Sequence, residues 1–263
     1  MHGADVQRQC AAHVQPRVTG SDRAGLAGLL QEGPPVVPRP SASLLVIDGR
    51  RRPWRVLMMQ RPGGAEFAPD AYVFPGGSVQ REDERWSDPY RAAAIRETFE
   101  EVGILFARGH GGRLASDRES RAVGEALGRG LEFFAALAEM GLRPAFDRLT
   151  LLTRWITPEP MRRRFDTRFY LARRPGRQQV LPAAGEVVDC VWLSVSEALD
   201  EGGPTLVHAT RRILEAIEGA SDATALIARL RHLSEPAPIR PVLRPRPDGP
   251  GYDVLDDAQP VFS

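Results

Sequence analysis

The stretch that decides the fold is RETFEEVG, residues 96–103, which follows YVFPGG at residues 72–77. It brings three carboxylates together: Glu97, Glu100 and Glu101. Side chains three and four residues apart are neighbours on a helix, so these carboxylates converge and repel one another. A cluster of this kind is either a solvated helix face or a cradle for divalent cations, and the surrounding sequence has to decide.

The helix that carries these acids is predicted over residues 89–106. Asp88 can accept hydrogen bonds from the first N–H groups, and Pro89 suits the first helical position because its missing N–H would have no partner there. Apolar residues repeat at i, i+4 and i+7 and predict a core-facing stripe of Ile95, Phe99 and Val102. The acids therefore form the polar face of an amphipathic helix.

Composition excludes several classes of protein. The chain has 263 residues, of which 42% are hydrophobic and 26% charged, as in soluble globular proteins. A net charge of +1 gives no argument for nucleic acid or a membrane as a partner. Cys10 and Cys190 lack the spacing of a metal site or a disulfide framework. The polar start, the lack of a long apolar run and the absence of an SKL-type tail make the cytoplasm the expected location.

The chain divides into three parts. Residues 1–40 are expected to be an N-terminal extension and linker, and residues 41–233 a single domain with a helical insert at about 117–141. Residues 234–263 form a Pro-rich C-terminal extension, expected to be mostly irregular.

Within the domain, strands and helices alternate irregularly. A hairpin is predicted from residues 41–48 and 54–61, and further strands at 149–157, 161–173 and 187–193, the last two joined by a hairpin turn at 172–179. Helices are predicted at residues 194–202, 205–219 and 221–233, and a short one at 23–33 in the N-terminal extension. This order favours an α+β fold with helices packed on a mixed sheet.

YVFPGG, a loop and then AAIRETFEEVGI together resemble the Nudix box. Gly77 would open the box, and residues 96–104 match its second half. Thr98 stands where the box has an apolar residue, and the loop before Arg96 is longer than in the standard box. The first acid of the box is therefore open among three residues: Glu82, Asp83 and Glu84.

The resemblance implies a Nudix fold, an α/β/α sandwich, and hydrolysis of a nucleoside diphosphate linked to another moiety. It also implies Mg²⁺ or Mn²⁺ as cofactor, held by Glu97, Glu100 and Glu101 with the Gly76 carbonyl, while Arg96 orients the glutamates. Glu97 and Glu100 are the expected catalytic acids. Such a cation neutralises diphosphate charge and lowers the pKa of bound water.

MMQRP, RWITP and RRFDTRFYLA extend the resemblance over roughly residues 40–215, to the subfamily that contains the animal peroxisomal coenzyme A diphosphatase. Coenzyme A or an acyl-CoA is therefore the first substrate expected. ADP-ribose, nucleotide sugars and dinucleoside polyphosphates are the alternatives within the family. A nucleotide-metabolite sensor without catalysis is the alternative of another class. Oligomeric state is left open, with a homodimer compatible.

The remaining roles stay open between alternatives. The general base is a glutamate of the box or Glu186, with Asp189 a weaker candidate. Arginine matches phosphate oxygens bidentately, so Arg61, Arg164 and Arg168 are candidates for substrate binding. The last two are equally well explained as the solvated face of an edge strand.

Overall fold

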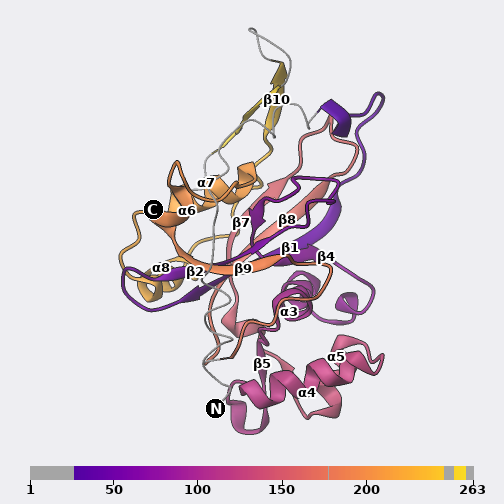
Figure 1. The fold of residues 1–263 in the computed structure, drawn as a ribbon, viewed down its shortest axis with the longest axis vertical. Helices are drawn as coiled ribbons and strands as arrows, with labels where there is room; N and C mark the ends of the chain where they lie inside the picture. The colour runs from indigo at the N-terminus through magenta and orange to yellow at the C-terminus, as the bar shows by residue number, and fades with distance from the viewer. Residues whose placement is uncertain (1–26, 177, 246–251, 259–263) are drawn as a thin grey trace.

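The computed structural model describes residues 27–176, 178–245 and 252–258. These residues form a seven-stranded sheet with helices on both faces (Figure 1). The strand order is β3-β2-β1-β8-β7, with β4 paired to β1 and β9 paired to β2. The strands are β1 (Arg39–Asp48), β2 (Arg55–Gln60), β3 (Tyr72–Val73), β4 (Gly76–Ser78), β7 (Thr150–Ile156), β8 (Phe165–Arg173) and β9 (Asp189–Ser194).

Two strands share one side of β1, and this opens the sheet. β4 pairs with β1 at Ser41–Ser43, whereas β2 pairs with it only at Ile47 and Asp48. After Val56, β2 diverges from β1. It pairs antiparallel with β9 over its whole length, from Arg55 to Gln60. The sheet is therefore splayed between β4 and β2.

The structure corrects the expected pairing on the other side of β1. The predicted hairpin between residues 161–173 and 187–193 is wrong, because β9 pairs with β2 and not with β8. β8 instead lies between β1, to which it is parallel, and β7. It is therefore not an edge strand, and it begins at Phe165, after the arginine run at 162–164.

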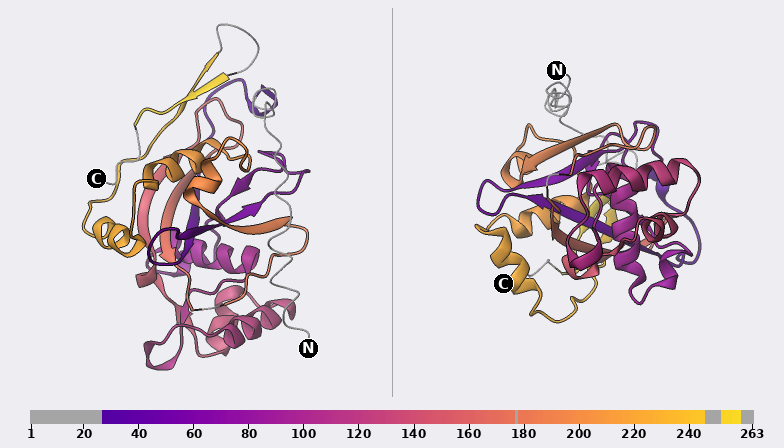
Figure 2. Two further views of the ribbon diagram at one scale, coloured as in Figure 1. Left: turned by 60° about the vertical axis from the view of Figure 1, so that its left-hand side comes forward. Right: turned by 90° about the horizontal axis from the view of Figure 1, so that it is seen from below.

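Helices cover the two faces, which gives the expected α/β/α sandwich (Figures 1 and 2). On one face α3 (Pro89–Val102) packs on β1, and the insert helices α4 (Asp117–Gly128) and α5 (Phe133–Glu139) pack beyond it. On the other face lie α6 (Val195–Leu199), α7 (His208–Ile217) and α8 (Ala223–Leu230).

The helix α3 begins where the sequence predicted. The Asp88 carboxylate accepts a hydrogen bond from the Arg91 N–H at 3.0 Å, and Pro89 is the first helical residue. The predicted end at residue 106 is wrong, because the helix stops at Val102. Gly103 adopts a left-handed φ of 71°, and its N–H donates to the Phe99 carbonyl.

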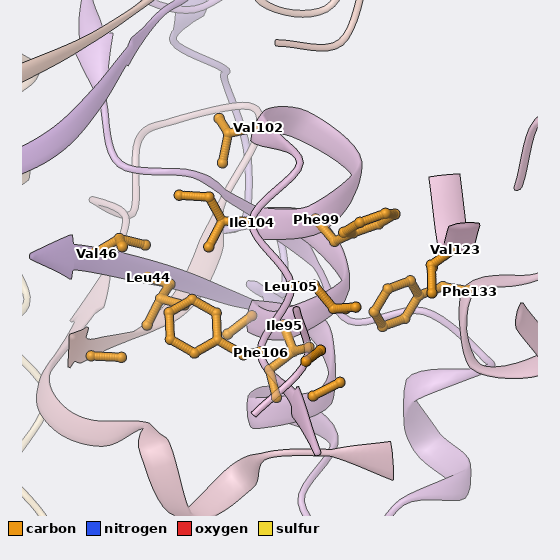
Figure 3. Close-up of a cluster of buried hydrophobic side chains, with 14 of the residues drawn as sticks. Leu44, Val46, Ile95, Phe99, Val102, Ile104, Leu105, Phe106, Val123 and Phe133 are labelled. Atoms are coloured by element: carbon orange, nitrogen blue, oxygen red, sulfur yellow. The ribbon is translucent and has the colours of Figure 1, made fainter. Parts of the chain in front are cut away.

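The apolar stripe of α3 is buried, as predicted. Phe99 faces the insert, where its ring lies 5.5 Å from that of Phe133, and Val123 lies beside them (Figure 3). Ile104 and Phe106, just past the helix, lie toward β1 in the same cluster. The apolar residues of α3 are thus packed between β1 and the insert helices.

The C-terminal extension is more ordered than predicted. It contains an antiparallel hairpin of β10 (Val242–Pro245) and β11 (Tyr252–Leu255), so an irregular structure was the wrong expectation for these residues. Two short strands, β5 (Ala107–Arg108) and β6 (Arg143–Pro144), flank the insert. Most of the extension predicted over 1–40 and part of the helix predicted at 23–33 lie outside the described residues, whose first element is a 3₁₀ turn at Ala27–Leu29. In the described part of the chain, no helix has the length and apolar character needed to span a membrane.

Candidate active site

The two glycines of β4 let the acidic face of α3 approach the sheet. A Cβ on Gly77 would lie 2.5 Å from the Glu97 Cδ, and one on Gly76 would lie 2.6 Å from the Ser43 Cα. The Gly76 N–H donates to the Glu101 carboxylate at 2.7 Å. A side chain at Gly77 would displace the Glu97 carboxylate, and one at Gly76 would collide with the backbone of β1, so close packing requires both glycines.

Arg96 lies at the centre of the acidic cluster with none of its surface exposed. Its Nη1 lies 2.9 Å from Glu97 Oε1 and 2.8 Å from Glu100 Oε2, and its Nη2 donates to the Ser78 carbonyl at 3.1 Å. Burial by itself would lower the pKa of Arg96, but bonds to its acidic neighbours outweigh burial and raise it. The guanidinium therefore stays charged and contacts two carboxylates of the helix at once.

Of the three candidates for the first acid of the box, Asp83 lies closest to Arg96. It is fully buried, and its two oxygens accept from Arg96 Nε and Nη2 at 3.1 and 2.9 Å. Glu82 reaches only to 4.0 Å from Arg96, and Glu84 is exposed. Of the three candidates, Asp83 thus makes the direct bidentate contact with Arg96.

The glutamates are held in a state of mutual repulsion. Burial, with the neighbouring Glu97 and Glu186 charges, raises the pKa of Glu101 to about 8 against the lowering effects of the Gly76 N–H and Arg61. Burial also raises the pKa of Glu100 to about 6 and raises the pKa of Glu97. One arginine does not compensate this many acids, so the site favours an additional cation.

The donor set fits a hard cation such as Mg²⁺. Carboxylate oxygens are the ligands that Mg²⁺ prefers, and it usually retains waters and shares substrate phosphates instead of filling an all-protein cage. This matters because, among the described residues, no three acid, histidine or cysteine side chains converge closely enough to hold an ion alone. The glutamates would supply part of the coordination, with water and substrate supplying the rest.

The loop before β9 brings Glu186 to the acids. The Leu181 N–H donates to the Val102 carbonyl and the Ala183 N–H to the Glu101 carbonyl, both at 2.9 Å, so the loop is fixed to the end of α3. Glu186 itself is exposed, and its charge raises the pKa of both Glu97 and Glu101. It is therefore a solvent-facing carboxylate that acts electrostatically on the cluster.

The three candidate arginines lie in different environments. Arg61, at the end of β2, donates to the Phe67 carbonyl at 3.1 Å, and its charge lowers the pKa of Glu101, so it adjoins the cluster. Arg164 is buried and donates to the Thr157 and Val36 carbonyls at 3.0 and 2.8 Å. Through these two hydrogen bonds, the Arg164 side chain joins the segment before β1 to the turn before β8.

Arg168 lies on the face of the sheet that α3 covers, at the N-terminal end of that helix. Its guanidinium stacks 4.1 Å from the centre of the Tyr90 ring and pairs with Glu235 at 3.0 Å. Tyr90 lies in the first turn of α3, whereas the glutamates lie in its second half. Within the described residues, Arg168 forms no hydrogen bond or ion pair with Glu97, Glu100 or Glu101, so of the three arginines Arg61 is the one associated with the cluster.

Gln178 supports the site, although the sequence analysis did not single it out. It is 1% exposed, accepts from the Leu105 N–H at 2.7 Å, and donates to the Leu105 and Ala115 carbonyls at 3.1 and 2.9 Å. These bonds tie the Glu186 loop to the segment that follows α3. A lone glutamine beside an arginine-rich turn gives no sequence signal for this role.

Comparison with known proteins identifies the relatives of this chain. The family model for the NUDIX domain matches residues 37–127, and the model for the NUDT19 Nudix domain matches residues 87–202. A Caenorhabditis elegans protein, putative nudix hydrolase 7, is 32% identical over 163 residues, which cover 62% of this chain and 54% of the worm protein. The match thus spans about half the length of that relative. The crystal structure of a NUDIX hydrolase from Alicyclobacillus acidocaldarius has a TM-score of 0.62 and 25% identity, covering 76% of this chain and 99% of that one.

Proposed function

The chain belongs to the Nudix superfamily, and from this premise we propose that it hydrolyses the diphosphate bond of a nucleoside diphosphate linked to another moiety. The observation that carries the proposal is the acidic face of α3, held by the buried Arg96 against the glycines of β4. A protein that needed only a stable helix would gain nothing from this repulsion, since like charges at this spacing destabilise the helix.

Each residue has a role in the proposal. Glu97, Glu100 and Glu101, with the Gly76 carbonyl, would supply part of the coordination of Mg²⁺ or Mn²⁺, and Arg96 keeps the carboxylates in place. When bound, the cation would neutralise diphosphate charge and promote ionisation of the attacking water. Glu186 accepts the proton of that water from the open side of the cluster. Arg61 binds the diphosphate, as arginine does through paired N–H groups.

Coenzyme A or an acyl-CoA is the substrate we propose first. Its support is the match of residues 87–202 to the NUDT19 Nudix domain, together with the subfamily resemblance in MMQRP, RWITP and RRFDTRFYLA. Pure protein with Mg²⁺ and coenzyme A should release phosphopantetheine and adenosine 3′,5′-bisphosphate. Turnover of ADP-ribose, a nucleotide sugar or a dinucleoside polyphosphate, with no turnover of coenzyme A, would refute the coenzyme A assignment. The proposal that the protein is a diphosphate hydrolase would stand.

A variant pair separates an enzyme from a nucleotide sensor. Glu100→Gln removes a proposed metal ligand, and Glu125→Gln changes an exposed acid of α4 as the matched control. Loss of turnover in the first alone, with its melting temperature preserved, supports catalysis. Tight nucleotide binding with no turnover in the wild type or either variant would favour the sensor instead.

A further inference from the structure

A second site lies on the face of the sheet opposite α3. A cavity of about 460 Å³ opens there, within the size range of small-molecule sites, which is about 300–1,000 Å³. Trp155 of β7 and Phe169 of β8 form part of its floor, and both belong to the hydrophobic cluster that α3 does not touch. The glutamate cluster and this cavity are therefore distinct places in the fold.

The terminal segments of the described chain complete the cavity. Leu29 closes it from the N-terminal side, and Leu243 and Val254 of the β10–β11 hairpin close it from the C-terminal side. In Figures 1 and 2 this hairpin and the first described residues lie at the same end of the molecule. The extensions on both sides of the domain thus build a wall of this cavity.

That wall is fixed to the sheet. Ile239, just before the hairpin, exchanges backbone hydrogen bonds with the edge of β7, accepting from Ile156 at 2.9 Å and donating to Arg154 at 2.8 Å. Asp256, just after the hairpin, accepts from His208 at 2.6 Å and from Arg212 at 2.7 Å. Both ends of the hairpin are anchored, so the cavity is a built feature of the fold.

The chemistry of the lining selects an apolar ligand. Its charged members already have partners: Glu66 is paired with Arg163, and His208 with Asp256. The lining thus offers an apolar surface whose charged groups are already paired, which suits an aliphatic chain better than a sugar or a phosphate.

The rim of the cavity connects it to the acids of α3. Phe67 lines the cavity and is 44% exposed, while its backbone carbonyl accepts from Arg61 at 3.1 Å. Arg61 in turn stands at the end of β2, where the sheet is splayed from β4 and Glu101 is bonded to Gly76. One loop, residues 61–69, therefore borders both sites.

We propose that this cavity binds the acyl chain of a substrate whose diphosphate lies at the glutamate cluster. This inference rests on the proposed function, and it adds where the apolar end of the substrate is bound and what the terminal extensions do. The acyl chain passes the Phe67 rim and packs between the sheet and the β10–β11 hairpin.

The test uses neighbouring residues of the hairpin as matched pairs. Leu243→Asp and Val254→Asp place a charge in the cavity wall, whereas Val242→Asp and Leu255→Asp place it on the exposed side of the same strands. Binding of dodecanoyl-CoA and coenzyme A is measured by calorimetry with EDTA present, so that no turnover occurs. We expect the wall variants to bind dodecanoyl-CoA at least about tenfold more weakly than the controls, with coenzyme A binding unchanged, because a charge cannot be buried against an aliphatic chain without cost.

Dodecanoate without a nucleotide separates this inference from the proposed function. Dodecanoate binding that the wall variants lose and the controls retain supports the apolar site even if coenzyme A is never hydrolysed. Equal affinity of wild-type protein for dodecanoyl-CoA and coenzyme A overturns the inference, and so does equal behaviour of wall and control variants. Circular dichroism and melting curves of all four variants establish that the comparison is made between folded proteins.

Discussion

Asp83 and Arg96 form a bidentate ion pair in which both side chains are buried, with N–O distances of 3.1 and 2.9 Å. The pair joins the loop before α3 to the face of the helix that carries the acids. It leaves Nη1 of Arg96 for Glu97 and Glu100. The direction of two proposed metal ligands thus depends on an acid that lies outside the helix.

The substitution Asp83→Asn should therefore destabilise the fold and reduce turnover. The substitution weakens charge-assisted hydrogen bonds to Arg96, a loss of about 1.5–3 kcal/mol, while Glu97 and Glu100 still balance the guanidinium charge. Urea unfolding measures the loss, and Glu84→Gln, at the exposed neighbouring acid, should stay within about 0.5 kcal/mol of the wild type. Equal stability of the two variants would show that the pair contributes nothing.

Replacing Gly77 by alanine should reduce turnover through displacement of Glu97. The new Cβ would lie 2.5 Å from the Glu97 Cδ, so the carboxylate or the strand must move. Misplacement of a catalytic group by about 1 Å can cost on the order of 100-fold in rate. The matched control is Gly202→Ala, where no atom lies within 4 Å of the new Cβ. Unimpaired turnover in Gly77→Ala would contradict a catalytic role for Glu97.

Glu186 and Asp189 can be separated as proton acceptors by their neutral amides. Glu186 is exposed beside the cluster, so Glu186→Gln should lower kcat by about 100-fold or more while leaving the melting temperature unchanged. Asp189 lies at the start of β9, where its carboxylate accepts from the Cys190 N–H at 2.8 Å and burial raises its pKa. Asp189→Asn should retain most of the activity. The reverse ranking would transfer the base role to Asp189.

A pH-dependent contribution to stability is expected from the start of α4. Bonds from Arg113 and from Ser116 lower the pKa of Glu119 from its ordinary 4.5 to about 2. A carboxyl group with a lowered folded-state pKa stabilises the fold above its unfolded pKa, and the stabilisation is lost as pH falls through the folded value. Glu119→Gln should therefore cost about 1 kcal/mol at pH 7, and the difference from wild type should shrink between pH 4.5 and 2.

Urea midpoints across that pH range provide the measurement. Glu125→Gln, on the exposed side of the same helix, is the control and should show no such trend. A difference between Glu119→Gln and wild type that is independent of pH would mean that the capping geometry, and not the charge, supplies the stability.

Local sequence was sufficient for much of α3. The Asp88 cap and the apolar stripe depend on interactions within one or two helical turns, so the printed sequence predicts both correctly. The end of the helix was missed because the spacing of the apolar stripe continues to Phe106, while the left-handed conformation of Gly103 stops the helix. Spacing alone does not report that conformation.

Pairings between distant segments could not be read in the same way. β8 and β9 follow each other in sequence with a turn-like segment between them, which suggested a hairpin, yet β9 completes the sheet beside β2. Burial decided this arrangement, since Cys190 of β9 packs into the cluster beneath α3. The same crossing loop carries Gln178 and Glu186 to the end of α3.

By itself, the sequence determined that one helix presents three glutamates opposite an apolar stripe and follows a pair of glycines, because each of these features is set by residue identity and helical spacing. Only the tertiary structure shows that Asp83 is the partner of Arg96 and that Arg164 donates its hydrogen bonds to backbone carbonyls. It also shows that the terminal segments form part of the lining of an apolar cavity. These outcomes depend on which groups are buried together. Burial makes an unpaired charge or polar group costly, and only the folded chain determines which partner is within reach.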